Sequence, residues 1–308
     1  PISKDIDIRI LNNMRREFQY WYPVDLRVSG KDLIPNHLTY CIYNHVAIWP
    51  DQPDLWPKSF RANGYLMLNS EKMSKSTGNF LTISETVEKY GADATRIGLA
   101  DSGDAIDDAN FLEKTTDAAV LRLYNLIIWS REMISSDNLR TGPQDSFCDR
   151  VFLNEINRSI HLTQISYDNM LFREAIKNGF FDLQLSRDWY KEISLQSMHR
   201  DVILRYIEIQ CILLAPICPH ICDYLYQLIK NQSIMLASWP EDITHDTQLH
   251  ECSQYLFDSI SSFRNRLKTL KDSNAKKKKT ILPKSASIYV AIDYAPWQRD
   301  ILSMLKNM

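Results

Sequence analysis

The residues best suited to chemistry lie in one short segment, from Glu71 to Asn79. This segment holds two lysines, Lys72 and Lys75, three hydroxyl side chains and Gly78. An ammonium group is a compact charge on a flexible stem, which suits a polyphosphate whose charge moves during a reaction. Hydroxyl groups can donate to phosphate oxygens, and the glycine lets the loop bend over a nucleotide and open again. The pattern favours a phosphate-binding loop, and the alternative is a solvated basic turn.

The flanking elements place this segment between a strand and a helix. The apolar run Gly64–Asn69 predicts a buried strand, and Thr82–Glu85 has the capping-box pattern that opens a helix. Upstream, Val24–Ser29 alternates as a strand does, Gly30 ends it, and Leu33–Trp49 predicts a helix. Together these elements predict a β-α-β unit, the second half of a Rossmann-like sheet, with the lysines on a strand-to-helix loop that is a common place for phosphate chemistry.

An acidic group follows the loop, and its members are Asp101, Asp104, Asp107 and Asp108. The group invites a calcium interpretation, but it lacks EF-hand spacing. We expect Asp107 or Asp108 to act instead as the N-cap of the next helix.

The rest of the chain is predicted to be mainly helical. Residues 82–100 predict two short helices that are split at Gly91. Residues 112 to 232 predict a bundle, with an interhelical loop at Thr141–Pro143. Further helices are expected at 151–170, 172–194 and 198–230. In the first bundle helix, five residues follow helical spacing, and these are Ala118, Leu121, Asn125, Ile128 and Met133. We expect Trp189 and Tyr190 to be core aromatics rather than a binding platform.

The C-terminal part combines basic residues with a new strand. Residues 249–272 predict an amphipathic helix with the apolar stripe Phe257, Ile260, Phe263, Leu267 and Leu270. Three basic residues lie off that stripe, Arg264, Lys268 and Lys271. A run of four lysines follows, Lys276, Lys277, Lys278 and Lys279, which is either a solvated linker or a phosphate-backbone contact. Residues 288–292 predict a strand and Pro296 to Met308 a helix.

Bulk composition is that of a soluble globular protein. The chain has 308 residues, 44% apolar and 24% charged, a net charge of −2, and no apolar run near the length needed to span a bilayer. The six cysteines include no Cys-x-x-Cys pair, so zinc is not expected. Cys218, His220 and Cys222 lie close together in sequence, and we expect buried thiols there rather than a metal site. The chain begins Pro1-Ile2-Ser3 and has no signal-peptide pattern, so we expect a piece of a longer protein.

Several motifs together resemble one enzyme family. The run Lys-Met-Ser-Lys-Ser (72–76) is similar to the signature loop of class I aminoacyl-tRNA synthetases. The block Tyr20–Leu33, continuing to Trp49, resembles leucyl-tRNA synthetase of the archaeal and eukaryotic cytosolic type. So do Arg61–Gly64, Asp107–Phe111 and Ala215–His220. The resemblance covers nearly the whole chain.

The resemblance implies a fold class, α/β plus all-α. It implies the C-terminal half of a Rossmann-like catalytic domain (1–70) and a signature-loop and stem-contact region (71–111). A helical tRNA domain of the anticodon-binding type (112–245) and a linker helix with the start of a small C-terminal α/β domain (246–308) would follow. The family's His-Ile-Gly-His-type signature and its editing domain are not in this sequence. We therefore expect a fragment that is inactive alone.

The resemblance also implies roles for individual residues. Lys75 and Lys72 would stabilise the leaving pyrophosphate, and Asp32, in the Gly30-Lys31-Asp32 pattern, would hold the adenosine ribose; the alternative for Asp32 is a helix cap. His37 would approach the adenylate pocket, or else be an ordinary surface histidine. Met73 would anchor the loop, and Ser74, Ser76 and Thr77 would donate to phosphates.

The implied substrates and partners are ATP with Mg²⁺, leucine and tRNA(Leu), the last contacted through the basic residues named above. A cytoplasmic location is implied, without a membrane, as is a monomer or a subunit of a multi-synthetase assembly. Two alternatives stay open: a non-catalytic tRNA- or protein-binding paralogue, and a class I synthetase for isoleucine, valine or methionine.

Overall fold

The computed structural model describes residues 6–74, 76–241, 244–276, 285, 287, 289 and 293–306. The chain divides into two compact units, one up to His250 and one from Glu251 on. Among the described helices, none is long and apolar enough to cross a lipid bilayer.

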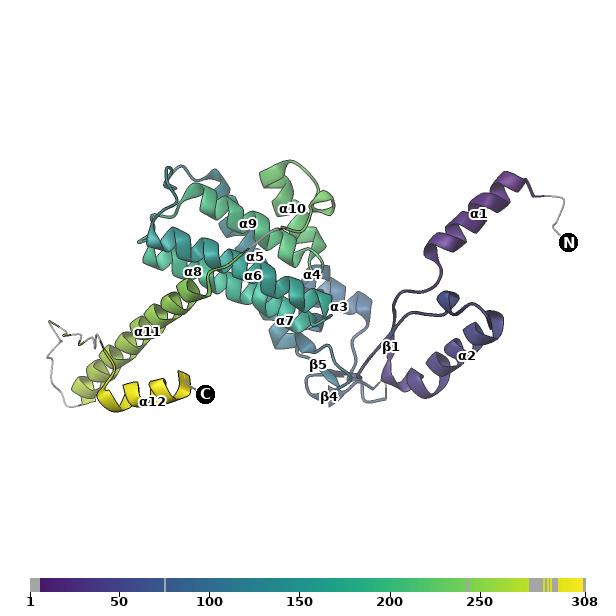
Figure 1. Ribbon diagram of the computed structural model, residues 1–308, viewed down its shortest axis with the longest axis horizontal. Coiled ribbons are helices and arrows are strands. Elements are labelled where there is room, and N and C mark those ends of the chain that lie inside the picture. The colour runs from purple at the N-terminus through teal and green to yellow at the C-terminus, as the bar shows by residue number, and fades with distance from the viewer. Residues whose placement is uncertain are drawn as a thin grey trace. The chain divides into compact units, whose positions relative to one another are not determined.

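Helices dominate the first unit (Figure 1). They are α1 (Ile8–Trp21), α2 (Thr39–Ile48), α3 (Ile83–Tyr90), α4 (Ala92–Ser102), α5 (Glu113–Ser135), α6 (Phe147–Asp168), α7 (Phe172–Ile176), α8 (Asp182–Ile193), α9 (Arg200–Leu214) and α10 (Pro219–Lys230). The strands are β1 (Arg27–Gly30), β2 (Phe60–Asn63), β3 (Leu66–Leu68), β4 (Glu71–Lys72) and β5 (Ala109–Phe111). Short helical turns lie at Lys31–Leu33, Ile34–Leu38, Pro53–Leu55, Lys177–Phe181 and Ile234–Leu236.

The expected β-α-β unit is present, but its second strand was assigned wrongly. β1 pairs in parallel with β2, so that Arg27 lies opposite Phe60 and Gly30 opposite Asn63, and α2 lies between the two strands in the chain. The sequence pattern instead predicts residues 64–69 as the second strand of the unit. The sequence of β2, Phe-Arg-Ala-Asn, has no apolar run, and none of its residues is fully buried. The hydrophobic pattern therefore did not reveal this strand.

The predicted strand at 64–69 belongs to a second sheet, of order β4-β3-β5. β3 pairs antiparallel with β4 and in parallel with β5. β5 was not predicted, and the expectation that Asp107 or Asp108 caps the next helix is wrong. α5 begins at Glu113 after β5, with Leu112 at its N-cap position. Three residues of strand are too short a stretch for periodicity to reveal.

Gly64 lets the chain pass from one sheet to the other. A Cβ at this position would lie 2.1 Å from the carbonyl oxygen of Asp107, and the N–H of Gly64 donates to the carbonyl of Ala105 at 3.1 Å. Only glycine allows the two backbone segments to approach this closely.

The first two helices after the signature loop, α3 and α4, follow the prediction. Thr82 and Glu85 form the expected capping box at the start of α3, each side chain accepting from the other's backbone N–H. The split at Gly91 is confirmed, and its φ of +80° suits glycine.

Of the five residues with helical spacing in α5, only Met133 lies on the side of the helix that is buried. The buried side of this helix carries Thr116, Ala119, Leu123, Leu126, Ser130 and Met133. Leu121 and Ile128 are exposed. Apolar residues occur all round this helix, so spacing alone did not select the face that packs against α4 and α9.

The bundle core lies among α5, α6, α8, α9 and α10 (Figure 1). The ring of Phe152 stacks on Tyr190 with centroids 4.7 Å apart and lies 5.6 Å from Tyr206. Tyr190 is therefore a core aromatic, as expected, whereas Trp189 is half-buried. The prediction of a single helix at 198–230 is wrong. The helix is interrupted between Leu214 and Pro219, and Pro219 is the first residue of α10.

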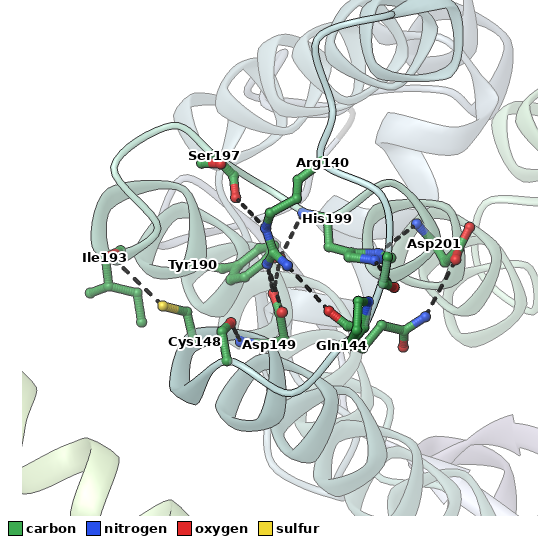
Figure 2. Close-up of polar contacts among 12 residues, drawn as sticks. Arg140, Gln144, Cys148, Asp149, Tyr190, Ile193, Ser197, His199 and Asp201 are labelled. Carbon is green, nitrogen blue, oxygen red and sulfur yellow. Dashed lines mark hydrogen bonds and ion pairs between the residues drawn. The ribbon is translucent and has the colours of Figure 1, made fainter.

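A buried polar cluster holds the loop between α5 and α6 in place (Figure 2). Arg140 donates from Nη2 to both oxygens of Asp149, at 2.7 and 2.6 Å, and the Tyr190 hydroxyl donates to the same carboxylate at 2.6 Å. The backbone N–H of His199 donates to that hydroxyl at 2.8 Å. The N–H of Arg140 also donates to the Met198 carbonyl at 2.9 Å, so one loop is tied to the start of α9 and to α6 and α8.

The second unit contains most of α11 (Thr247–Lys276), which begins in the first unit, and α12 (Pro296–Lys306). Both helices were predicted. The strand predicted at 288–292 lies outside the described residues, apart from Tyr289.

Candidate active site at the signature loop

The signature loop, residues Glu71–Asn79, is a narrow turn that follows β3. Asn69 and Ser70 have positive φ and reverse the chain into β4. The N–H of Ser74 donates to the carbonyl of Asn79 at 3.0 Å, which closes the tip of the loop. Inside that tip the Ser74 and Ser76 hydroxyls lie 2.8 Å apart. Lys75 lies outside the described residues, and Lys72 is exposed.

Met73 points to the inner side of the loop. Its side chain is half-buried and lines a largely apolar cavity of about 360 Å³. The other lining residues come from β3, α3, α4 and β5, and include Leu68, Thr86, Leu99 and Phe111. A flexible thioether suits such an irregular space, so the loop has an apolar contact beneath it.

Gly30 and Asp32 lie together where β1 ends. A Cβ on Gly30 would lie 2.6 Å from Oδ1 of Asp32, so the glycine leaves room for this carboxylate to fold back over the strand end. Asp32 is exposed within the turn Lys31–Leu33. An exposed carboxylate beyond a parallel strand is placed to accept hydrogen bonds from a ligand's hydroxyl groups.

His37 is also exposed, and its ring contacts Arg27. The guanidinium of Arg27 meets Nε2 of His37 and donates from Nη1 to the Cys41 sulfur at 3.3 Å. Because a guanidinium can only donate, Nε2 accepts in this arrangement. The imidazole is therefore engaged with a residue of β1 rather than with the signature loop.

A cluster of charges brings the end of β1 to the signature loop. Lys31 Nζ lies 2.6 Å from Oδ1 of Asp108, and the backbone N–H of Tyr65 donates to the same oxygen at 3.0 Å. The ammonium groups of Lys31 and Lys72 both lie over the Tyr65 ring, 4.9 and 5.7 Å from its centroid. Two segments that are 40 residues apart in sequence thus meet at one tyrosine.

Protonation in this cluster follows from the ion pair. The hydrogen bonds from Lys31 and from the Tyr65 N–H lower the pKa of Asp108 against a small desolvation, and the charge of Lys72 acts in the same direction. The hydrogen bond to Asp108 raises the pKa of Lys31. Asp108 is therefore ionised and the lysine protonated at neutral pH.

The helix behind the loop is bound tightly to the bundle. Asp93 of α4 accepts from the N–H of Ile221 at 2.8 Å and lies 2.9 Å from Nδ1 of His220, at the start of α10. Arg96, one turn on, donates to the carbonyls of Ile217 and Pro216 at 2.6 and 3.0 Å. The element that supports the signature loop and the helical bundle therefore form one packed structure.

The expected tRNA-contacting residues are described only in part. Arg264, Lys268 and Lys271 are exposed on α11. Lys276 is the last residue of that helix, and Lys277, Lys278 and Lys279 lie outside the described residues.

Other groupings of reactive residues have structural explanations. The thiol of Cys148 donates to the Ile193 carbonyl at 3.8 Å, beside the Arg140–Asp149 pair (Figure 2). Cys218 and Cys222 are buried, and burial raises the pKa of the Cys218 thiol, while the His220 ring contacts Asp93. Among the described residues, no group of three or more His, Cys, Asp or Glu side chains is arranged to hold a metal ion.

Sequence reasoning missed two members of the cluster. Tyr65 was treated only as part of a strand, and Asp108 was interpreted as a helix cap. Their contacts join residues 77 and 43 positions apart in sequence, which no local pattern encodes. Lys31 enters the sequence analysis only as part of the Gly30-Lys31-Asp32 pattern, without a role of its own.

Comparison with known proteins agrees with this geometry. A family model described as "tRNA synthetases class I (M)" matches residues 7–125, and one described as "Anticodon-binding domain of tRNA ligase" matches residues 149–290. The chain is 50% identical over 303 residues to a cytoplasmic leucine–tRNA ligase of Pongo abelii, covering 96% of this chain and 26% of that protein. The chain belongs to the leucyl-tRNA synthetase family. The family and the fold class expected from the sequence are thereby confirmed.

Two further relatives show how far the likeness to leucyl-tRNA synthetases extends. The chain is 38% identical over 237 residues to the leucine–tRNA ligase of Aeropyrum pernix, covering 75% of this chain and 24% of that protein. A crystal structure of a LeuRS from Agrobacterium radiobacter K84, in a ternary complex with tRNA and LeuAMS, shares the fold with a TM-score of 0.59 at 21% identity, covering 70% of this chain and 29% of that one. The chain spans about a quarter of the length of the curated relatives that it matches.

Proposed function

We propose that this chain is part of a leucine–tRNA ligase. Such an enzyme joins leucine to ATP, releases pyrophosphate, and passes the leucyl group to tRNA(Leu). The observation that supports the proposal is the cluster at Tyr65, where the signature-loop Lys72 and Lys31, the residue between Gly30 and Asp32, both lie over one ring. A cation at that place would face the phosphates of a nucleotide whose ribose lies at Asp32.

Lys75 and Lys72 are the proposed catalytic residues. Negative charge builds on the pyrophosphate as it leaves, and a preorganised ammonium stabilises that charge more in the transition state than in the ground state. Lys75→Ala should therefore lower the rate of leucine activation roughly a hundred- to thousand-fold, with much less effect on leucine binding.

The remaining site residues would bind ATP and the adenylate. Asp32 would accept from the ribose hydroxyls beside Gly30, and Ser74 and Ser76 would donate to phosphates. Met73 would fix the loop through its apolar contact, and His37 would approach the adenylate from the helical turn Ile34–Leu38 that follows β1. Mg²⁺ would accompany ATP, held mainly by the phosphates and water, as this ion usually is; the described residues do not form a metal site of protein groups alone.

The helical bundle and α11 would contact tRNA(Leu). Most of the bundle, but not α5, lies within the part of the chain that matches the anticodon-binding family model, and Arg264, Lys268 and Lys271 are exposed cations on α11. Contacts of ammonium and guanidinium groups with phosphates weaken as salt rises. We place the activity in the cytoplasm because relatives that are 50%, 51% and 33% identical to this chain carry that location in their names.

The test is amino-acid-dependent ATP–pyrophosphate exchange by the complete protein, with each standard amino acid in turn. We expect exchange with leucine alone, and a rate lowered roughly a hundred- to thousand-fold in Lys72→Ala and Lys75→Ala. Lys191→Ala, which removes an exposed lysine of α8 far along the chain, is the matched control and should exchange at the wild-type rate.

The other outcomes are equally informative. Exchange with methionine, isoleucine or valine would keep the reaction class but overturn the amino-acid assignment. The class I family model that matches residues 7–125 makes methionine worth including. No exchange with any amino acid, in a protein that still binds tRNA, would favour the non-catalytic binding module.

A further inference from the structure

Lys72 and Tyr65 lie on the same face of the second sheet. Met67 of β3 is directly opposite Lys72 of β4, and Tyr65 precedes Met67 by two residues. Residues two apart on a strand point to the same side, and a long side chain reaches its diagonal neighbour across the strands. The Lys72 ammonium accordingly lies 5.7 Å from the centroid of the Tyr65 ring, within the range of a cation–π contact.

The backbone of Tyr65 is fixed on both sides. Its N–H donates to the Asp108 carboxylate at 3.0 Å, and its carbonyl accepts from the N–H of Ala109 at 2.9 Å. The preceding residue, Gly64, is packed so closely against the backbone at Asp107 that no side chain would fit there. The ring that Lys72 contacts therefore belongs to a residue whose backbone is fixed by hydrogen bonds, although Tyr65 as a whole is 45% exposed.

Lys31 and Asp108 complete the electrostatic setting. Lys31 lies over the same ring, at 4.9 Å, and its charge is balanced by Asp108 at 2.6 Å. Two ammonium groups near one ring would otherwise repel each other, and the carboxylate offsets that repulsion. The Tyr65 ring can therefore contact both ammonium groups at once, because the Asp108 carboxylate offsets the repulsion between them.

A lysine side chain on an exposed hairpin has many rotamers, and most of them would not aim its ammonium at a substrate. Catalysis by charge stabilisation requires the charge to be in place before the reaction. We propose that Tyr65 is a positioning residue, which holds the Lys72 ammonium over the same ring as that of Lys31, the residue that follows Gly30 at the end of β1. This inference rests on the proposed function, because it assigns Lys72 to the pyrophosphate side of that reaction.

The experiment uses the complete protein and leucine-dependent ATP–pyrophosphate exchange. Tyr65→Phe keeps the ring and should exchange near the wild-type rate. Tyr65→Leu and Tyr65→Gln remove the ring and should lower kcat about three- to thirty-fold, the range expected for one cation–π contact, with an unchanged KM for leucine. Two ring-free variants of different polarity are used so that a folding defect in one does not decide the result, and thermal unfolding checks both.

A double-mutant cycle separates positioning from general damage. In a Lys72→Ala background, Tyr65→Leu should lower kcat no further, because the residue through which it acts is gone. A full additional loss there would show that Tyr65 acts on the fold and would overturn the inference. So would wild-type rates for both ring-free variants, or for Lys72→Ala itself. Absence of exchange in the wild-type protein would instead refute the proposed function, and this inference with it.

Discussion

Arg140 binds both carboxylate oxygens of Asp149 from a single nitrogen, and the two residues differ sharply in burial. The Asp149 side chain is fully buried, whereas the Arg140 side chain is 31% exposed (Figure 2). Burial alone would raise the pKa of Asp149, but hydrogen bonds from Arg140 and Tyr190 outweigh it and hold the pKa below its ordinary value. The loss in free energy of unfolding should therefore depend on whether Arg140 or Asp149 is substituted.

Arg140→Met should destabilise the protein by about 3–5 kcal/mol, because it leaves a buried carboxylate without its countercharge. Asp149→Asn should cost less, about 1–3 kcal/mol, because Arg140 can still reach water. Thermal or chemical unfolding of the three proteins measures this order. Asp25→Asn, which breaks an exposed pair with Lys58, is the control and should cost less than about 1 kcal/mol. Equal costs for Arg140→Met and Asp149→Asn would contradict the argument from burial.

Glu113 gives the protein a pH-dependent contribution to stability. The Lys89 ammonium, the Tyr90 hydroxyl and the Asn69 amide all donate to its carboxylate, and they lower its pKa from 4.5 to about 2. Since the native pKa is the lower one, the unfolded chain binds the proton first as the pH falls. The contribution is therefore complete above about pH 4.5 and is lost as the pH falls towards 2.

Unfolding free energies measured between pH 2 and 6 test this expectation. Glu113→Gln should flatten the part of the curve between pH 2 and 4.5. Glu132→Gln, at an exposed position of the same helix, should leave the wild-type slope. A Glu113→Gln curve that runs parallel to wild type would show that another group titrates there.

Two glycines near the signature loop should respond differently to substitution by alanine. At Gly64 the new Cβ would meet the Asp107 carbonyl oxygen at 2.1 Å, and backbone cannot move aside cheaply. We expect Gly64→Ala to cost about 1–3 kcal/mol or more. A Cβ at Gly78 would have no atom of the described residues within 4 Å, other than its chain neighbours. The φ of +73° is nevertheless unfavourable for alanine by roughly 1–2 kcal/mol.

The two effects should also differ in kind. Gly64→Ala should lower the melting temperature and disturb the Tyr65 segment. Gly78→Ala should lower the melting temperature less and should act mainly on the exchange rate, because its strain lies at the loop tip. A larger fall in melting temperature for Gly78→Ala than for Gly64→Ala would contradict this assignment.

Local signals explain why some elements could be predicted from sequence. Thr82 and Glu85 are three residues apart and satisfy each other, and Gly91 breaks a helix by itself. Long-range features carried no such signal. β5 owes its existence to pairing with β3, and Asp108 owes its role to Lys31, 77 residues earlier in the sequence.

The candidate site shows the same division. The motif identified Lys72 and Met73 because their types and order are characteristic, and Gly30 with Asp32 formed a recognisable pair. Tyr65 has no distinguishing neighbour in sequence, and only the β3–β4 register places it beside Lys72. The face of α5 could not be chosen because Val120, Leu121 and Tyr124 are apolar and yet exposed.

Asp93 should stabilise the junction between α4 and the bundle mainly as a cap for α10, and less through its ion pair. Its carboxylate accepts from the Ile221 N–H, one of the unpaired donors at a helix start, and Asp93 is buried. Asp93→Ala should therefore cost about 1–3 kcal/mol, and Asp93→Asn less, since the amide oxygen can still accept. His220→Ala should cost under about 1 kcal/mol, because that side chain is 73% exposed. Chemical unfolding at neutral pH gives the order, and a His220→Ala cost as large as that of Asp93→Ala would show that the ion pair, not the cap, holds the two helices.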